Sequence, residues 1–309
     1  DMKKIGLIDR IDEDYTHSVS VCYKCKKIIE PLLKEQWFVN ILPLAKPAIK
    51  AIKDKRIVFF PKSSEKVCLH WLRNIRDWNI SRQNWWGISI PAWKCSDCQE
   101  WTVTQGETPK SCGYCKSKKL ERDPDVFDTW FSSGQWPFAT LRGDDLKKFY
   151  PTSVMETAYD IIFFWVTRMI MLGLYITDEV PFKNVYFHGL VRDKDGEKMS
   201  KSKGNVIDPL VITDTYGTDA LRMALIVGNL PGRDMAISED KIRGYRNFIN
   251  KIWNIFRFIS FNTEDYDPRE RISLTAKDKK ILSDLEKTVD KITKYMESFR
   301  FSQAAETAY

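Results

Sequence analysis

The chain has 309 residues, 43% of them hydrophobic, which is enough to bury a core and form about two domains. Its net charge of +7 is compatible with a polyanionic partner, although many enzymes without one are equally basic. Apolar runs such as residues 161–166 are much shorter than the roughly 20 residues of a bilayer span. We therefore expect a cytoplasmic protein without a membrane segment.

The first region, residues 1–124, is rich in aromatic residues and lacks a clear period, so we expect an irregular region whose order depends on a metal. Six of the seven cysteines fall in three C-x-x-C pairs, a pattern that indicates metal ligation more than disulfides. Those pairs are Cys22/Cys25, Cys95/Cys98 and Cys112/Cys115. The remaining thiol, Cys68, is expected to be buried.

Two of these pairs lie close enough in sequence to form one site. Cys95, Cys98, Cys112 and Cys115 offer four thiolates that can close a tetrahedral zinc site within residues 95–115; four buried thiols are the alternative. A closed four-sulfur site has no open position for water, so this metal would hold the fold and do no chemistry. Cys22 and Cys25 supply only two ligands. That pair is either metal-free or completed by residues outside this chain.

Residues 125–232 show an α/β pattern that suggests half of a nucleotide-binding fold. A helix-like apolar run covers residues 161–175, a short strand covers residues 185–188, and a loop rich in glycine and lysine follows. Clustered lysines on a flexible backbone suit a loop that closes over phosphates. A solvated lysine loop explains the same composition.

Helices are predicted for the rest of the chain, the first over residues 220–227 after an N-cap at Thr218. Within residues 233–309, helices are predicted from Ser238 to residue 259, from an N-cap at Thr275 to residue 296, and over residues 300–309. A polar linker at residues 262–272 separates the two long helices. We expect them to pack as an antiparallel bundle.

The lysine loop carries the most specific motif of the chain. Its residues Lys198, Met199, Ser200, Lys201 and Ser202 match the KMSKS signature of class I aminoacyl-tRNA synthetases, and the loop follows His188-Gly189 as in that family. Segments at residues 77–83, 85–87, 125–133 and 159–165 resemble the valyl branch of the family nearly word for word. The isoleucyl relatives typically differ in the segment around Asp160.

This resemblance implies a fold of class α/β. Residues 125–232 would be the second half of a Rossmann-like catalytic domain, residues 1–124 would carry a zinc-binding insertion, and residues 233–309 would begin an α-helical anticodon-binding bundle. The implied activity is that of a valine–tRNA ligase: ATP activates valine to valyl-adenylate, and the valyl group is transferred to tRNA(Val). Magnesium would accompany ATP, and the full enzyme would be monomeric.

The resemblance also implies roles for particular residues. Lys198 and Lys201 would act on the ATP phosphates, and Asp160 would accept the ammonium of valine. The valine side chain would be enclosed by Trp130, Ile161 and Trp165. The ATP site would comprise His188, Gly189, Lys198, Met199, Ser200, Lys201 and Ser202. Without the resemblance, Asp160 would be interpreted as a helix cap, the tryptophans as core, and His188 as structural.

Some family features differ or are missing. Ala158 stands where the family usually has glycine, and Ile88 where it usually has histidine. The His-Ile-Gly-His signature is not in the chain, and the resemblance implies that it and the editing domain lie outside, with the partners of Cys22 and Cys25. The chain alone is then expected to be inactive and to bind no zinc at that pair.

Three other interpretations remain open. The chain could be a non-catalytic tRNA-binding module, an isoleucyl relative, or a zinc-ribbon nucleic-acid binder, which would leave the α/β segment without a role. Cations after Ser238 could contact tRNA phosphates or form a solvated helix face. These are Arg243, Arg246, Lys251 and Arg257.

Overall fold

The structure is a computed structural model that describes residues 2–22, 25–200, 204–267, 269 and 273–309. Its contacts divide it into two units, Asp1–Trp37 and Phe38–Tyr309, and we describe each by itself. The described residues of the first unit hold turns and an isolated bridge between Val21 and Ile28, and most of their side chains are exposed.

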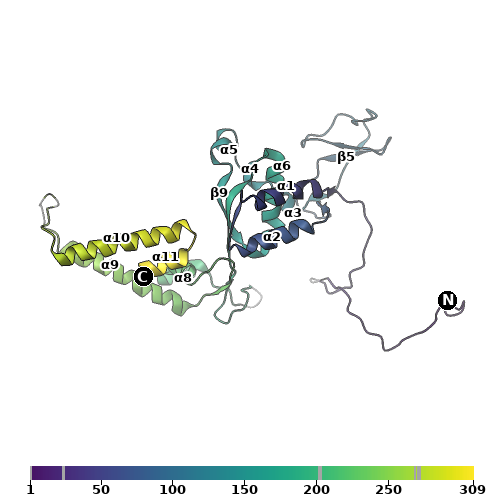
Figure 1. Ribbon diagram of the computed structural model, residues 1–309. Helices are drawn as coiled ribbons and strands as arrows, with labels where there is room; N and C mark the ends of the chain where they lie inside the picture. The colour runs from purple at the N-terminus through teal and green to yellow at the C-terminus, as the bar shows by residue number, and fades with distance from the viewer. Residues whose placement is uncertain (1, 23–24, 201–203, 268, 270–272) are drawn as a thin grey trace. The chain divides into compact units, whose positions relative to one another are not determined.

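A parallel sheet forms the centre of the second unit (Figure 1). Its strands, in the order β2-β10-β9, are Val58–Phe60, Phe182–His188 and Thr152–Ala158. The middle strand buries Phe182, Val185 and Phe187 almost completely, as expected for a parallel strand covered on both faces. The predicted strand at residues 185–188 is confirmed and begins three residues earlier.

Three helices pack beside this sheet: α1 (Leu42–Lys53), α2 (Ser63–Arg73) and α6 (Thr167–Thr177). Helix α2 contacts β2, and α1 contacts both α2 and α6. The segment Tyr159–Thr177 is the one described helix long and apolar enough to cross a membrane by length and composition. All residues from Thr167 to Leu174 are buried in the unit, however, which is the behaviour of an interior helix. The helix-like run predicted for residues 161–175 is confirmed, with two more residues at each end, and residues 167–174 lie in the core.

The expectation of an irregular region up to residue 124 is wrong for residues 38–73. They form α1, β2 and α2, and Cys68 on α2 is buried as expected. Helix α1 did carry a local signal that the interpretation as irregular missed, because its buried residues recur at helical spacing: Leu44, Ala45, Ala48, Ala51 and Ile52. Strand β2 had no such signal, since its partner β10 lies more than 100 residues later in the chain.

The other strands form small antiparallel or two-stranded sheets. The three strands of the cysteine module, in the order β6-β5-β7, are Trp101–Val103, Ala92–Cys95 and Leu120–Arg122. The remaining pairs are β1 (Phe38–Val39) with β3 (Trp78–Asn79), β4 (Ser81–Arg82) with β8 (Val126–Phe127), and β11 (Val191–Arg192) with β12 (Met235–Ala236). Only the last of these pairs is parallel. Three short helices precede β9: α3 (Thr129–Ser133), α4 (Trp136–Ala139) and α5 (Asp144–Phe149).

The last part of the chain is helical, as predicted. Its helices are α7 (Pro209–Tyr216), α8 (Thr218–Ile226), α9 (Glu239–Phe261), α10 (Ala276–Glu297) and α11 (Phe301–Ala308). Thr275 caps α10 in a reciprocal capping box with Asp278, and Ser238 caps α9. Thr218 is not the N-cap of α8: Gly217 takes that position with a φ of 90°, which glycine adopts without strain.

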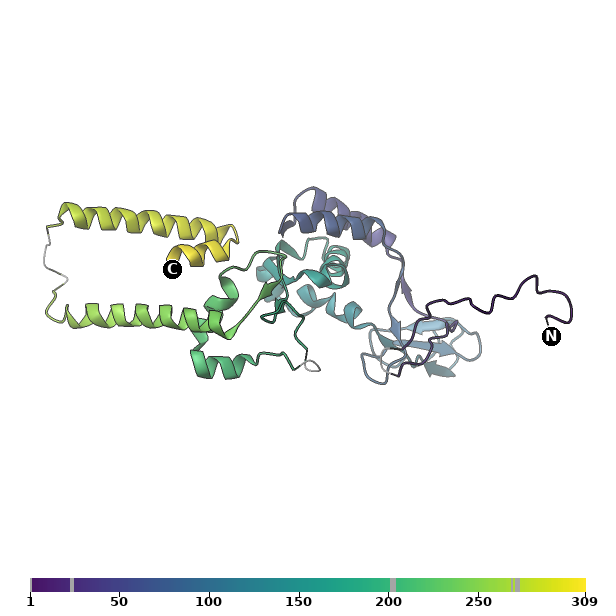
Figure 2. The same cartoon turned by 90° about the horizontal axis from the view of Figure 1, so that it is seen from below.

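The two long helices do not form the expected closed bundle within the described residues. Apolar side chains on both stay exposed, among them Trp253 and Phe256 on α9 and Leu285 and Val289 on α10. Instead α9 packs on α8, and α10 packs on α11 (Figure 2). The aromatic ring of Phe299, just before α11, contacts the sheet residues Phe60 and Tyr186.

Candidate functional site

The carboxyl ends of two neighbouring strands define the site. His188, the last residue of β10, lies opposite Ala158, the last residue of β9, in a parallel register. The segments that follow, Tyr159–Ile161 and Gly189-Leu190, therefore emerge at the same edge of the sheet. In open α/β sheets, ligands bind outside the carboxyl ends of the strands. The structure thus brings Asp160 and His188, expected to bind valine and ATP, to one edge.

The residues after β9 follow an unusual helical path. Tyr159–Ile161 forms a 3₁₀ turn and Ile162–Val166 a π-helical turn before α6 begins. A 3₁₀ turn is common at the start of a helix, whereas π-helical turns are rare and are found frequently at functional sites. Asp160 is exposed in the first turn, while Ile161 is half-buried. The carboxylate of Asp160 is accordingly accessible to a ligand.

The two tryptophans expected to enclose the amino acid lie on adjoining segments. The indole Nε1 of Trp165, in the π-helical turn, donates a hydrogen bond of 2.9 Å to the carbonyl oxygen of Ser133 in α3. Trp130 of α3 stacks on Phe164, with ring centroids 5.6 Å apart. Both tryptophan rings are half-buried. They are held by named contacts and keep part of their surface accessible.

A buried charged network behind these tryptophans was missed by the sequence analysis. Asp128, just before α3, accepts hydrogen bonds from Trp78 Nε1 at 3.1 Å and Arg168 Nη1 at 3.4 Å. The Nη2 of Arg82 lies 3.2 Å from its other oxygen. Burial lowers the pKa of Arg168 to about 10, although the Asp128 carboxylate favours the charged guanidinium. The sequence signal was present only as residues 125–133, to which the resemblance assigned no role for Asp128.

His188 and Gly189 are held by protein groups on both sides. The His188 Nδ1 lies 2.8 Å from the Gly189 oxygen, and its Nε2 lies 3.4 Å from Glu156. A Cβ on Gly189 would come within 1.7 Å of the Arg233 carbonyl oxygen. The close approach that requires glycine here is therefore made by the protein's own backbone at Arg233. The expected approach of this glycine to ATP stays a prediction.

The signature loop is anchored at its base. Asn205 accepts a hydrogen bond from the Ser200 N–H at 2.9 Å and donates one to Asp193 at 2.7 Å. Met199 packs against the core cluster formed by α7, α8 and α9, whereas the Lys198 side chain is exposed. Lys201 and Ser202, which complete the motif, lie outside the described residues.

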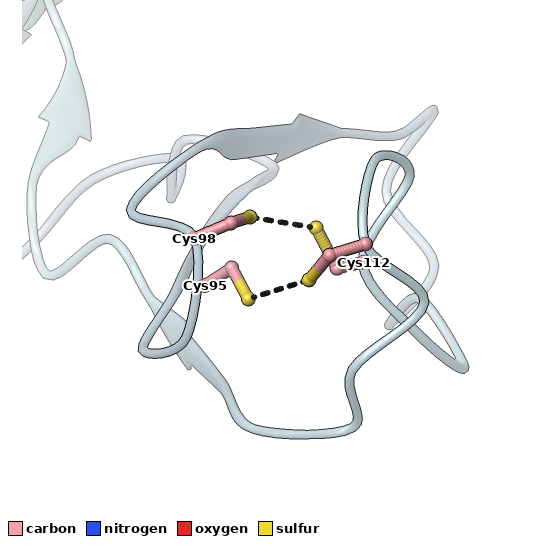
Figure 3. A group of neighbouring side chains, drawn as sticks. Cys95, Cys98 and Cys112 are labelled. Atoms are coloured by element: carbon pink, nitrogen blue, oxygen red, sulfur yellow. Dashed lines mark hydrogen bonds between the residues drawn. The ribbon is translucent and has the colours of Figure 1, made fainter.

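Four sulfur atoms converge in the antiparallel module, as predicted for a metal site (Figure 3). The sulfurs of Cys95, Cys98, Cys112 and Cys115 lie within 4.8 Å of one another, with closest pairs at 3.5 Å. Four thiolates at about 2.3 Å from a tetrahedral zinc would be about 3.8 Å apart, so the residues fit such an ion. Backbone N–H groups, that of Cys115 foremost, lower the pKa of Cys112 to about 6 and favour the thiolate.

All three C-x-x-C pairs share one backbone hydrogen bond. The N–H four residues after each first cysteine donates to that cysteine's carbonyl oxygen: Lys26 to Cys22 at 2.8 Å, Gln99 to Cys95 at 2.9 Å, Lys116 to Cys112 at 3.1 Å. Each donor residue has a φ near +60°. Among the described residues, the four-cysteine module is the one cluster that could hold a metal. The expected absence of zinc at Cys22 and Cys25 stays a prediction.

The four cations expected to contact tRNA phosphates lie on α9. Arg243, Arg246, Lys251 and Arg257 are all exposed. Arg243 pairs with Asp240 at 2.6 Å, and the Lys251 ammonium lies 5.3 Å from the ring of Phe248. Exposed cations of this kind fit both a contact with tRNA phosphates and a solvated helix face.

The structure combines a parallel sheet, helices beside it and a candidate site at its carboxyl edge, and comparison with known proteins assigns the class. The family described as tRNA synthetases class I (I, L, M and V) matches residues 13–238. The chain belongs to this family.

Proteins called valine–tRNA ligase are similar over the whole chain. The one from Dehalococcoides mccartyi strain 195 is 51% identical over 98% of this chain, and the one from Thermotoga maritima is 49% identical over all of it. The chain spans about a third of these relatives, 35% and 36% of their lengths. The similarity therefore concerns one continuous part of them.

Solved structures show the same fold. A methionyl-tRNA synthetase of Mycobacterium tuberculosis in complex with methionyl-adenylate superposes with a TM-score of 0.69 at 18% identity, over 94% of this chain and 53% of its own. LeuRS of Agrobacterium radiobacter K84, in a ternary complex with tRNA and LeuAMS, gives a TM-score of 0.66 at 21% identity, over 79% of this chain and 37% of its own. These likenesses confirm the expected α/β class of the catalytic domain.

Proposed function

We propose that this chain is the part of a valine–tRNA ligase that holds one side of the site where ATP activates valine. The observation that carries the proposal is the meeting of Asp160 and His188-Gly189 at the carboxyl edge of the sheet. Identities of 47–51% with valine–tRNA ligases support valine as the substrate. The second product of activation is pyrophosphate, and the valyl group then passes to tRNA(Val).

The exposed carboxylate of Asp160 suits the ammonium of valine, because a carboxylate and a cation form a charge-assisted hydrogen bond. Trp130, Ile161 and Trp165 surround the aliphatic side chain in this proposal, since rigid aromatic faces fit a branched group. Their half-buried state supports this role, because fully buried side chains could not reach a ligand.

ATP binds between His188-Gly189 and the signature loop. Lys198 and Lys201 move onto its phosphates as charge develops there, an electrostatic role for which the exposed ammonium of Lys198 is suited. Met199 and Ser200 anchor the base of the loop. Magnesium, coordinated mainly by the phosphates, neutralises part of their charge.

Other parts of the chain have supporting roles in the proposal. Zinc in the four-cysteine module stabilises residues 95–115, and α9 begins an anticodon-binding domain whose cations contact tRNA phosphates. The domain limits in this proposal are those expected from the sequence, residues 1–124, 125–232 and 233–309, except that residues 38–73 add α1, β2 and α2 to the catalytic domain. The full protein is a cytoplasmic monomer. A non-catalytic tRNA-binding module would not need the exposed Asp160 or the accessible tryptophans, so we favour the enzyme.

Substitution of Asp160 in the full-length protein tests the site. Asp160→Asn should raise the KM for valine at least tenfold, because a charge-assisted hydrogen bond is worth roughly 1.5–3 kcal/mol, with a smaller effect on the KM for ATP. Asp144→Asn is the matched control, since Asp144 is 99% exposed on α5. Equal KM values for valine in the two variants would remove Asp160 from the valine site.

A further inference from the structure

One carboxylate, Asp234, joins the two halves of the proposed site. It lies just before β12, and its Oδ1 accepts hydrogen bonds from the Tyr159 hydroxyl at 2.9 Å and from the Leu190 N–H at 2.8 Å. Its Oδ2 accepts from the guanidinium of Arg192. No role for Asp234 or its partners follows from the sequence motifs.

The contacts of Asp234 lead to both substrates. Tyr159 immediately precedes Asp160, the residue proposed to hold the ammonium of valine. Arg192 lies on β11, and its backbone forms an antiparallel β-bridge with that of Lys198. Its guanidinium donates to the Gly196 oxygen at 3.3 Å. One oxygen of the carboxylate thus contacts the turn that contains Tyr159 and Asp160. The other contacts residues 191–198, the segment that leads into the signature loop and is called the Lys198 arm below.

The backbone at Asp234 is held by its neighbours, so a movement of the segment at Arg192 can reach Tyr159 through the carboxylate. β12 pairs with β11, and the N–H of Met235 donates to the Leu190 oxygen at 3.1 Å. A Cβ at Gly189 would meet the Arg233 carbonyl carbon at 2.1 Å and the Asp234 nitrogen at 2.6 Å. Backbones packed this closely move together more readily than they separate.

The charges of the network favour the bonded state. The Leu190 N–H and the Arg192 guanidinium lower the pKa of Asp234, and the hydrogen bond to Asp234 raises the pKa of Tyr159. At neutral pH the tyrosine hydroxyl therefore donates to an ionised carboxylate, which is stronger than a bond between neutral groups. The side chain of Asp234 is only 20% exposed, so little water competes for it.

We propose that Asp234 is a positioning residue that couples the Lys198 arm to the Tyr159-Asp160 turn, so that ATP and the amino acid strengthen each other's binding. This inference rests on the proposed function, because it takes Asp160 and Lys198 as ligand-binding groups. Coupling between two sites is reciprocal and typically changes affinity roughly 5–150-fold. Binding of either substrate should therefore order the other's site through Asp234.

The test measures valine binding to the full-length protein with and without α,β-methylene ATP. In this analogue a methylene group replaces the oxygen between the α- and β-phosphates, so the bond that breaks during activation stays intact. In the wild type, the ratio of the two dissociation constants should be at least about fivefold. Tyr159→Phe removes one link of the network, and Asp234→Asn weakens the pair with Arg192. Each should bring the ratio to within about twofold of one, with valine alone bound nearly as before.

Tyr150→Phe provides the matched control. The Tyr150 hydroxyl donates to the Glu179 backbone oxygen at 3.0 Å and accepts from the Thr177 hydroxyl at 2.9 Å, away from the site, so its loss removes two hydrogen bonds between neutral groups. This variant should be destabilised to a similar degree and keep the wild-type ratio. A wild-type ratio of one, or ratios at the wild-type value in Tyr159→Phe and Asp234→Asn, would overturn the coupling. If the wild type bound neither valine nor the analogue, the proposed function would fail, and the inference with it.

Discussion

The guanidinium of Arg168 lies 3.7 Å from the ring centroid of Trp78, and both side chains donate to the same Asp128 oxygen. Asp128 and Arg168 are 6% and 8% exposed, so the charges are largely removed from water. Removing one partner of a buried pair leaves an uncompensated charge. This arrangement secures α3, which carries Trp130, against α6.

Arg168→Met should therefore lower the free energy of unfolding by about 3 kcal/mol, near the low end for broken buried pairs because Arg82 still faces Asp128. Urea unfolding of the full-length protein, followed by tryptophan fluorescence, measures this change. Arg142→Met, at an exposed arginine, should change stability by less than about 0.5 kcal/mol. Similar losses in the two variants would show that the network contributes little.

Gly189→Ala should be one of the most destabilising single substitutions in the chain. The added Cβ would overlap the Arg233 carbonyl, which is backbone and cannot rotate away as a side chain can, so we expect a loss of at least about 3 kcal/mol. Gly244→Ala in α9 is the control, because its Cβ would meet nothing within 4 Å. That change should stabilise by roughly 0.5–1 kcal/mol, since alanine favours the helix. Equal thermal midpoints for the two variants would contradict the close approach.

Local patterns in the sequence predicted the structure where residues interact with near neighbours. The N-cap at Thr275, the period of α9 and the four cysteines all act over short distances, and the structure confirms each of them. The central strand β10 was also predicted, because its apolar run is continuous.

Features that depend on distant contacts had no local signal. β2 is a strand because β10 lies beside it, and Gly189 must be glycine because the Arg233 backbone passes close to it. Asp128 and Asp234 are acidic residues like many others until the fold gathers three donors around each. The resemblance predicted which residues bind substrates, but it did not predict the residues that hold those side chains in position.

Removal of the metal should affect one module. In the chain of 309 residues we expect one zinc, and its chelation should expose the amides of β5, β6 and β7 to hydrogen exchange while β10 stays protected. Cys112→Ser should abolish zinc binding. Cys68→Ala should keep the zinc, because this buried thiol is not in the cluster. A second zinc per chain by elemental analysis would reveal another set of ligands, most directly at Cys22 and Cys25.

The stabilising effect of Asp234 should depend on pH. Its folded-state pKa is lowered, chiefly by the Leu190 N–H, so its contribution is complete above the unfolded value near 4 and is lost as pH falls through the folded value. Asp234→Asn should be less stable than the wild type at about pH 6, and the difference should shrink below about pH 4. Urea midpoints at several pH values measure it. A constant difference across this range would mean that the carboxylate charge is not involved.

Valine-dependent exchange between ATP and pyrophosphate tests the central claim most directly. The assay should use the full-length protein, with isoleucine and threonine in place of valine as controls. We predict exchange that requires an amino acid and is fastest with valine, since the proposed pocket of Trp130, Ile161 and Trp165 fits a short branched side chain. No exchange with any of the three would contradict the assignment of an activating enzyme, and preference for isoleucine would move the protein to the isoleucyl branch.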